Sequence, residues 1–288
     1  MERGAGLRVA IQGEPGAFSH AAALVLVGET LELVPTPDFE ALFLALSRER
    51  ADRALVPIEN TLTGSIHENY DRLRASPFHV IAETRLRIRQ CLIGRPGATL
   101  GGLRRVASHP VALAQCRGFF AAHPEIQAVP AADTAGSVKE LMNGGDASSG
   151  AIASELAAEL YGALLLQADV EDDPENHTRF LLLAREPGRV EGSAKTSIVF
   201  TLENRPGALY AALQAFASRG VDLTKIESRP LRGRPFEYAF YLDLVGDPER
   251  EAGEALAELR RTSRDLRVLG SYPEGLKRDP ARSMKGEA

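Results

Sequence analysis

Apolar and polar positions alternate along residues 7–184 in a way that divides this part of the chain into strand-sized and helix-sized segments. Short apolar runs such as 54–60 have the length of buried strands, and segments such as 38–49 are apolar on one side only, as in amphipathic helices. Strands that alternate with helices of this length predict an α/β fold with parallel sheets and crossover helices. The expected strands are 7–13, 31–36, 54–60 and 85–94, the expected helices are 19–28, 38–49 and 64–75, and further strand–turn–helix units are 104–120, 126–142 and 150–162.

A second pattern begins near residue 196. Its segments read strand, helix, strand, strand, helix, strand, and 236–246 places Phe236, Phe240 and Leu244 on one face with a strict period of two. We expect the first of its helices to open at Pro206. This order predicts a ferredoxin-like βαββαβ module. The expected boundaries are a first domain at 7–184, a linker at 185–195, a second domain at 196–273 and a disordered tail at 274–288.

Composition narrows the class of protein. A chain of 288 residues with a formal net charge of −5 is long enough for two domains and gives no reason to expect nucleic acid as a partner. Its two cysteines form no CxxC pair, and no apolar run is long enough to span a membrane. The first ten residues lack the apolar core of a signal peptide. We therefore expect a cytoplasmic protein.

The turns that follow the expected strands are rich in Ser, Thr, Gly and Asn. In parallel sheets, ligands bind beyond the carboxyl ends of the strands, where helix N-termini favour anions. Each turn alone is equally explained by ordinary helix capping. Together they predict a site for a small molecule that carries a carboxylate. The turns are 13–19, 57–65, 107–110, 132–137 and 153–155.

Six motifs in order carry a resemblance to a known family. They are GEPGAFSHAAA, VPIENTLTGSIHENYD, SHPVALAQC, NHTRFLLLA, NRPGAL and TKIESRP. The chain resembles the prephenate dehydratases, and its C-terminal module resembles their regulatory ACT domain. The resemblance implies a two-lobed catalytic domain like the type II periplasmic binding proteins, and decarboxylating dehydration of prephenate to phenylpyruvate in phenylalanine biosynthesis. It implies no cofactor and no metal, and the histidines match no metal-site signature.

The resemblance also implies roles for particular residues. Thr178 would donate a proton to the leaving hydroxyl, directly or through water. Arg179 would stabilise negative charge or hold a carboxylate, but neighbouring residues of a strand point to opposite faces, so both reach one ligand only where the strand is just beginning. Phe180 is alternatively a core residue, and Thr134 a helix cap. The catalytic candidates are Thr178, Arg179, Glu59 and Asn60, and the substrate-binding candidates are Ser108, Gln115, Thr134 and Phe180.

In the C-terminal module the resemblance implies inhibition by L-phenylalanine bound between two ACT domains, in a homodimer or homotetramer. Backbone N–H groups at the start of a helix suit the carboxylate of the effector, and Glu227 would meet its amino group. The alternative is an ACT domain kept only for dimerisation. The effector-binding candidates are Asn204, Gly207, Ala208, Leu209, Glu227, Ser228, Arg229 and Pro230.

Two other functions stay open. The segment GSIHENYD is close to the form found in plant-type arogenate dehydratases, which leaves the choice between prephenate and arogenate undecided. A two-lobed domain joined to an ACT domain would also suit a non-catalytic amino-acid sensor. The combined presence of the Thr178-Arg179-Phe180 and PIEN motifs favours an enzyme.

Overall fold

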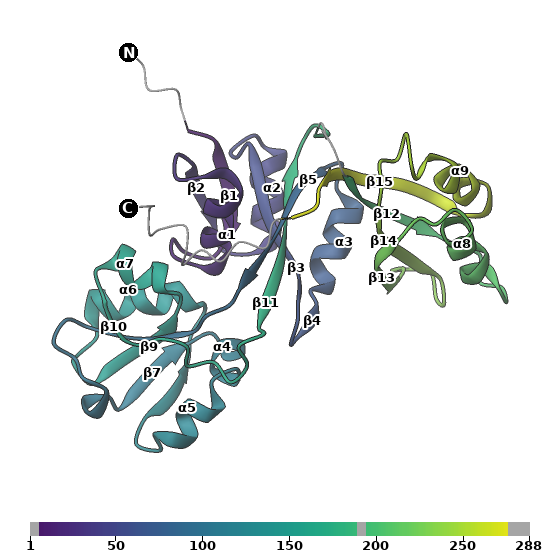
Figure 1. Ribbon diagram of the computed structural model, residues 1–288. Coiled ribbons are helices and arrows are strands. Elements are labelled where there is room, and N and C mark those ends of the chain that lie inside the picture. The colour runs from purple at the N-terminus through teal and green to yellow at the C-terminus, as the bar shows by residue number, and fades with distance from the viewer. Residues whose placement is uncertain (1–5, 189–193, 276–288) are drawn as a thin grey trace, which may run out of the picture. The chain divides into compact units, whose positions relative to one another are not determined.

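The computed structural model describes residues 6–188 and 194–275, which form two compact units (Figure 1). Within the described part, one unit contains residues 6–65 and 84–180, and the other contains 66–83 and 181–275. Most of the expected tail at 274–288 and the middle of the expected linker lie outside the described residues. No helix among those described is long and apolar enough to cross a membrane.

The first sheet has six strands in the order β2-β1-β3-β11-β5, with β4 paired to β3. Strand β1 pairs in parallel with β2 and β3, as the alternation of strands and helices predicts. Helix α2 begins after Asp38, whose side chain accepts a hydrogen bond from the Ala41 N–H. The elements are β1 (Arg8–Gln12), α1 (Phe18–Val27), β2 (Glu32–Thr36), α2 (Phe39–Ser47), β3 (Arg53–Asn60), β4 (Gly64–Ser65), β5 (His79–Arg87) and β11 (His177–Ala184).

The second sheet has five strands in the order β10-β6-β9-β7-β8. Strand β7 pairs in parallel with β8 and β9, but β6 is antiparallel to both β9 and β10, so the sheet is mixed. The single strand expected at 85–94 is wrong: it is two strands, β5 and β6, that belong to different sheets. The elements are β6 (Cys91–Gly94), β7 (Arg105–Ser108), α4 (Pro110–Ala114), α5 (Arg117–Ala122), β8 (Gln127–Pro130), α6 (Thr134–Gly144), β9 (Ser149–Ala153), α7 (Glu155–Tyr161) and β10 (Leu164–Gln167), with a short 3-10 turn η1 at Leu100–Gly102.

The C-terminal module has the predicted βαββαβ order, and its strands form one antiparallel sheet in the order β13-β14-β12-β15. Two boundaries differ from the prediction: β12 starts at Ala194, and α8 starts at Ala208, after Gly207 with a left-handed φ of 77°, instead of at Pro206. The elements are β12 (Ala194–Thr201), α8 (Ala208–Ala217), β13 (Leu223–Pro230), β14 (Tyr238–Val245), α9 (Gly253–Thr262) and β15 (Arg264–Pro273).

Helix α3 (His67–Ala75) covers the face of this sheet that α8 and α9 leave free (Figure 1). Ile198 and Leu242 pack toward the two helices in the apolar core. Because side chains alternate along a strand, Tyr241 points the other way. Its hydroxyl donates to the carbonyl of Tyr70 on α3 at 3.0 Å, and the two rings meet edge to face at 5.0 Å.

Candidate active site

Asn60 and Thr178, which are 118 positions apart in the sequence, come together where β3 ends and β11 begins. Strands β3 and β11 are neighbours in the first sheet, which brings the two side chains onto one edge. The Asn60 Nδ2 donates to the Thr178 Oγ1 at 3.0 Å, and both residues are 8% exposed. The structure thus joins two of the residues that the sequence proposes for catalysis.

The direction of this hydrogen bond follows from the turn after β3. The backbone N–H groups of Leu62 and Thr63 donate to one atom of the Asn60 side chain, at 2.9 and 3.0 Å, so that atom must be the oxygen. An asparagine that accepts from the N–H groups two and three residues ahead is a common way to stabilise such a turn. The Asn60 amide nitrogen therefore faces Thr178, whose oxygen accepts. The hydroxyl proton of Thr178 remains available for another acceptor.

Two further amides continue the network. The Asn60 Nδ2 also donates to the Asn176 Oδ1 at 2.7 Å, and the Asn176 Nδ2 donates to the Gln115 Oε1 at 3.0 Å. Asn176 is completely buried. Sequence reasoning missed Asn176, although it lies two residues before Thr178 in the same motif, a spacing typical of side chains on one face of an extended chain.

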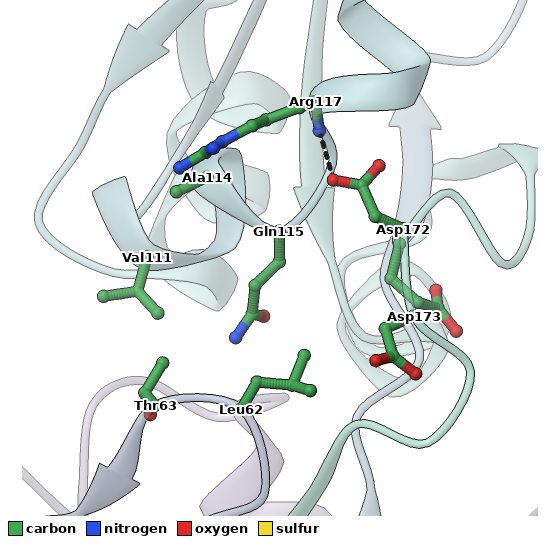
Figure 2. A pocket seen from close by; sticks show the side chains of 9 residues that line it. Leu62, Thr63, Val111, Ala114, Gln115, Arg117, Asp172 and Asp173 are labelled. Carbon is green, nitrogen blue, oxygen red and sulfur yellow. Dashed lines mark hydrogen bonds between the residues drawn. The ribbon is translucent and has the colours of Figure 1, made fainter.

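Gln115 lines a cavity of about 340 Å³, near the lower end of the range of roughly 300–1,000 Å³ found for small-molecule sites. Figure 2 shows the Gln115 amide nitrogen pointing into the cavity, toward the side where Leu62 and Thr63 lie. Gln115 follows the last residue of α4, so it stands at the end of a short helix. The lining residues are Leu62, Thr63, Val111, Ala114, Gln115, Arg117, Glu171, Asp172 and Asp173.

Asp172 contributes charge to the cavity lining, but its carboxylate is already used. Its two oxygens accept from the backbone N–H groups of Arg117 and Gly118, at 2.9 and 2.7 Å, where helix α5 begins. Figure 2 shows the first of these hydrogen bonds. A carboxylate at a helix N-terminus is stabilised by the free N–H groups there. Asp172 therefore fixes the start of α5 beside the cavity.

Arg179 and Glu59 are not brought to the Thr178 hydroxyl. Strand β11 already begins at His177, so Thr178 and Arg179 point to opposite faces of the sheet. Arg179 is 5% exposed and lies within the strand. Glu59 immediately precedes Asn60 in β3, so its side chain points away from the face that carries Asn60. Thr178 and Arg179 are the second and third residues of β11, and a ligand shared by the two stays a prediction.

The structure buries Ser108 and Phe180 and places neither in the lining of this cavity, so their contact with a substrate stays a prediction. Ser108 is completely buried, and its hydroxyl donates to the Ile152 carbonyl at 2.6 Å, which ties β7 to β9. Phe180 is 2% exposed and belongs to the core. Thr134 is the first residue of α6, where Asp133 provides the cap by accepting from the Gly136 N–H at 2.5 Å. The capping role considered for Thr134 thus falls to its neighbour.

The effector candidates divide into two groups. Asn204 and Gly207 are exposed, and Ala208 and Leu209 open helix α8. Ser228 and Pro230 are exposed on β13. The side chains of the remaining two candidates, Glu227 and Arg229, turn toward other partners.

Glu227 and Arg229 point toward helix α3. A Glu227 carboxylate oxygen lies 3.3 Å from the Nε2 of His67, and the Arg229 guanidinium lies 3.0 Å from the Asp71 carboxylate. The hydrogen bond to Asp71 raises the pKa of Arg229, which keeps the guanidinium charged. The Glu227 carboxylate is directed at α3 in this structure, and its contact with the amino group of an effector stays a prediction.

Both cysteines are free, buried thiols. Burial raises the pKa of Cys91 to about 11 and that of Cys116 to about 12, so neither forms a thiolate nucleophile at neutral pH. Among the described residues, no group of three or more His, Cys, Asp or Glu side chains is arranged to hold a metal ion.

Comparisons with known proteins assign both parts of the chain. Residues 9–188 match the family model described as prephenate dehydratase, and residues 196–261 match the ACT domain model. The chain is 44% identical over 287 residues to arogenate dehydratase/prephenate dehydratase 2, chloroplastic, from Arabidopsis thaliana, covering 95% of this chain and 74% of that protein. It is 43% identical over 288 residues to arogenate dehydratase 2 from Petunia hybrida, covering 94% of this chain and 72% of the relative.

Solved structures agree with the predicted fold class. A prephenate dehydratase from Arthrobacter aurescens, solved in complex with L-Phe, is 34% identical with a TM-score of 0.85, covering 95% of this chain and 92% of that one. A structure described as GqqA, a novel type of quorum quenching acylase, is 35% identical with a TM-score of 0.84, covering 93% of this chain and 98% of that one. The predicted α/β fold with a C-terminal ACT domain is confirmed.

The predicted cytoplasmic location is contradicted. Several curated relatives, including two from Arabidopsis thaliana at 44% and 42% identity, are described as chloroplastic.

Proposed function

Because the chain belongs to the prephenate dehydratase family, whose members are hydro-lyases, we propose that it converts prephenate to phenylpyruvate by decarboxylating dehydration. Within the family, the products of dehydration serve phenylalanine biosynthesis. The observation that carries the proposal is the hydrogen bond from Asn60 to Thr178, which leaves the threonine proton free to be donated.

The reaction requires little beyond a proton donor and a fixed geometry. The bond between the ring and its carboxylate breaks, carbon dioxide leaves, and the bonding electrons enter the ring. The hydroxyl at the opposite ring carbon departs with the proton from Thr178 as water, and the ring becomes aromatic. A proton from solvent then restores the Thr178 hydroxyl. A positioned donor lowers the barrier because hydroxide itself is a poor leaving group, and alignment of both breaking bonds with the ring π-system supplies much of the remaining acceleration.

Arogenate is the alternative substrate, since relatives at 43–44% identity are described as arogenate dehydratases. Arogenate carries an amino group where prephenate carries a keto group, and the ring chemistry is the same. Thr178 would therefore act identically on both substrates. The choice depends on contacts to the side chain of the substrate.

The test is to measure kcat/KM for prephenate and for arogenate with one preparation of the full chain. Formation of phenylpyruvate from prephenate at a rate well above the spontaneous reaction supports the proposal. A large preference for arogenate would assign the alternative. Failure to convert either substrate, with phenylalanine binding retained, would favour an amino-acid sensor.

Regulation by L-phenylalanine is the second part of the proposal. It is supported by the ACT domain match and by the Arthrobacter aurescens relative solved with L-Phe. Strand β13 lies at the edge of its sheet, with Ile226 49% exposed, and Tyr210 on α8 is 71% exposed. An edge strand with apolar side chains nearby suits pairing with a second copy. We propose a homodimer, alone or within a homotetramer, that binds phenylalanine between its ACT domains.

Calorimetric titration with L-phenylalanine and sedimentation of the full chain test this part. Binding together with a dimer or tetramer supports it. A monomer that does not bind phenylalanine, yet still dehydrates prephenate, would restrict the function to catalysis.

One structural relative adds a second reaction to test, because it is described as a quorum quenching acylase. Acyl transfer through a hydroxyl needs a neighbouring base to remove its proton. Among the residues described, the side-chain partner of the Thr178 hydroxyl is the amide nitrogen of Asn60, a donor that cannot act as a base. We therefore expect hydrolysis of an acylated quorum signal by this chain to be undetectable beside its dehydratase activity.

A further inference from the structure

The three amides beside Thr178 are aligned in one direction. The backbone N–H groups of Leu62 and Thr63 fix the Asn60 oxygen, so the Asn60 nitrogen must meet the oxygen of Asn176. The Asn176 nitrogen must then meet the oxygen of Gln115. Each step follows because an N–H can only donate and a carbonyl oxygen can only accept.

The alignment decides which end of Gln115 enters the cavity. With its Oε1 held by Asn176, the Gln115 Nε2 points into the cavity, as Figure 2 shows. Among the residues that the structure describes, none accepts a hydrogen bond from this nitrogen. The cavity therefore offers an N–H donor, which suits an oxygen of an anionic substrate.

Asn176 links the orientation of the Asn60 amide to the orientation of the Gln115 amide. It is completely buried, and its backbone carbonyl is held by the Ile88 N–H at 2.7 Å, so it has little freedom to reorient. A second donor to the same Gln115 oxygen is the amide nitrogen of Gln90, at 3.4 Å, a longer and weaker contact.

We propose that Asn176 is a positioning residue that fixes the orientation of Gln115, so that the cavity presents a hydrogen-bond donor to a carboxylate of the substrate. The inference rests on the proposed function for the identity of that substrate. The amide nitrogen and the amide oxygen of glutamine occupy the same volume, so size does not decide which of them faces the substrate. The hydrogen bond from Asn176 to the Gln115 oxygen decides it. A reversed amide would turn its oxygen toward the substrate anion and repel it.

The variant Asn176→Asp tests the direction. At pH 8 the new carboxylate has no N–H to offer, so Gln115 turns its nitrogen toward it and its oxygen toward the cavity. Protonation of that carboxyl at lower pH restores one acceptor and one O–H donor, and with them the original orientation. We expect the KM for prephenate to rise about 10- to 100-fold at pH 8, the range for a lost hydrogen bond to a charged group, and to fall toward the wild-type value as pH is lowered to 6. We expect kcat to change much less.

Other ionisable groups lie on the segments that contact Asn176, and all are present in the wild-type chain. The matched control Asn143→Asp places the same new charge at an exposed position on α6. The pH dependence of the ratio between each variant and the wild type therefore isolates the new carboxyl. The groups concerned are Glu59, Arg87, Arg89, Arg117, Glu171, Asp172, Asp173, Glu175 and His177.

A second variant covers the case in which Asn176→Asp does not fold. Gln115→Glu keeps an acceptor for the Asn176 nitrogen but removes the donor from the cavity, so it should also raise KM at pH 8 and recover at lower pH. A rise in KM that is the same at every pH, or no rise in either variant, would overturn the proposal.

Binding of phenylpyruvate, measured by calorimetry, separates this inference from the proposed function. If the wild type converts neither prephenate nor arogenate, the proposed function fails, and the dissociation constants of the variants at pH 8 and pH 6 still decide the role of Asn176. The same pH-dependent weakening supports it. A wild type that binds no phenylpyruvate and converts neither substrate would overturn both.

Discussion

The polar groups around Asn60 are neutral, whereas many of those between helix α3 and the C-terminal sheet are charged. Around Asn60 the partners are a threonine hydroxyl, amides and backbone groups. Between α3 and the sheet, Arg229 meets Asp71 at 3.0 Å. In the same unit, the Lys195 ammonium meets the Glu83 carboxylate at 3.1 Å, with both side chains at most 2% exposed.

The two regions are stabilised by different kinds of polar interaction. An ion pair resists separation, because removing one partner leaves an uncompensated buried charge. A neutral amide network specifies direction, because each amide has one donor end and one acceptor end. The amides nearest Thr178 follow the second arrangement, whereas the carboxylates of Glu171, Asp172 and Asp173 lie farther along the lining of the cavity. Substitutions that reverse direction should therefore impair catalysis, and substitutions that remove charge should impair stability or regulation.

The largest expected effect is on catalysis, in Asn60→Asp. The new carboxylate has no N–H for Thr178, so the threonine donates its proton to it and not to the substrate. We expect kcat to fall by about 10²–10⁴, the usual contribution of a positioned proton donor, with the thermal midpoint changed far less. Steady-state kinetics on prephenate at pH 8 measure the effect, with Asn143→Asp as the control for added charge. Unchanged kcat would show that the direction of this hydrogen bond is irrelevant.

The next effect is on stability, in Lys195→Met. Because Glu83 would remain buried without its cation, we expect the free energy of unfolding to fall by about 3–5 kcal/mol, measured by urea denaturation. The double variant Lys195→Met with Glu83→Leu should recover most of the loss, because it removes both charges.

The matched control for that loss is Lys139→Met, at an exposed pair with Glu14 of 3.0 Å. An exposed pair contributes about 0–1 kcal/mol, so this change should be small. Equal losses at Lys195 and Lys139 would contradict the distinction between the buried and the exposed pair.

The smallest effect concerns regulation, in Asp71→Asn. Its pair with Arg229 is partly exposed and should contribute about 0.5–1 kcal/mol, which corresponds to about a twofold to fivefold change in an equilibrium. If α3 carries the response of β13 to an effector, the phenylalanine concentration for half-inhibition should shift by that factor. Glu68→Gln is the control, because Glu68 pairs within α3 with Arg72. A shift of the same size in Glu68→Gln would show that the contact between Asp71 and Arg229 of β13 has no specific role in regulation.

Hydrophobic periodicity predicted most of the fold because it records which faces are buried. The C-terminal βαββαβ order and the cap at Asp38 followed from local pattern alone. The division of 85–94 between two sheets did not, because strand pairing depends on partners far along the chain. The contact between α3 and the C-terminal sheet was hidden for the same reason.

The candidate site was only partly predictable. Thr178 and Asn60 were found through their motifs, and the structure joins them. Ser108 also has a hydroxyl, but this hydroxyl is buried and donates to the Ile152 carbonyl, so it links two strands. Asn176 looked like an ordinary polar residue, since its importance lies in the orientation of two other amides. Residue type can be read from a sequence, but the direction of a hydrogen bond requires the partners in place.

The central claim is that the Thr178 hydroxyl donates the proton that releases water. The most direct measurement is kcat for prephenate with Thr178→Val beside Thr178→Ser. Valine keeps the shape and removes the hydroxyl, and Asn60 retains Asn176 and the His177 carbonyl as acceptors, so the fold should persist. The account predicts that kcat falls by about 10²–10⁴ in the valine variant and that serine restores most of it. A valine variant within about threefold of the wild-type kcat would contradict the claim.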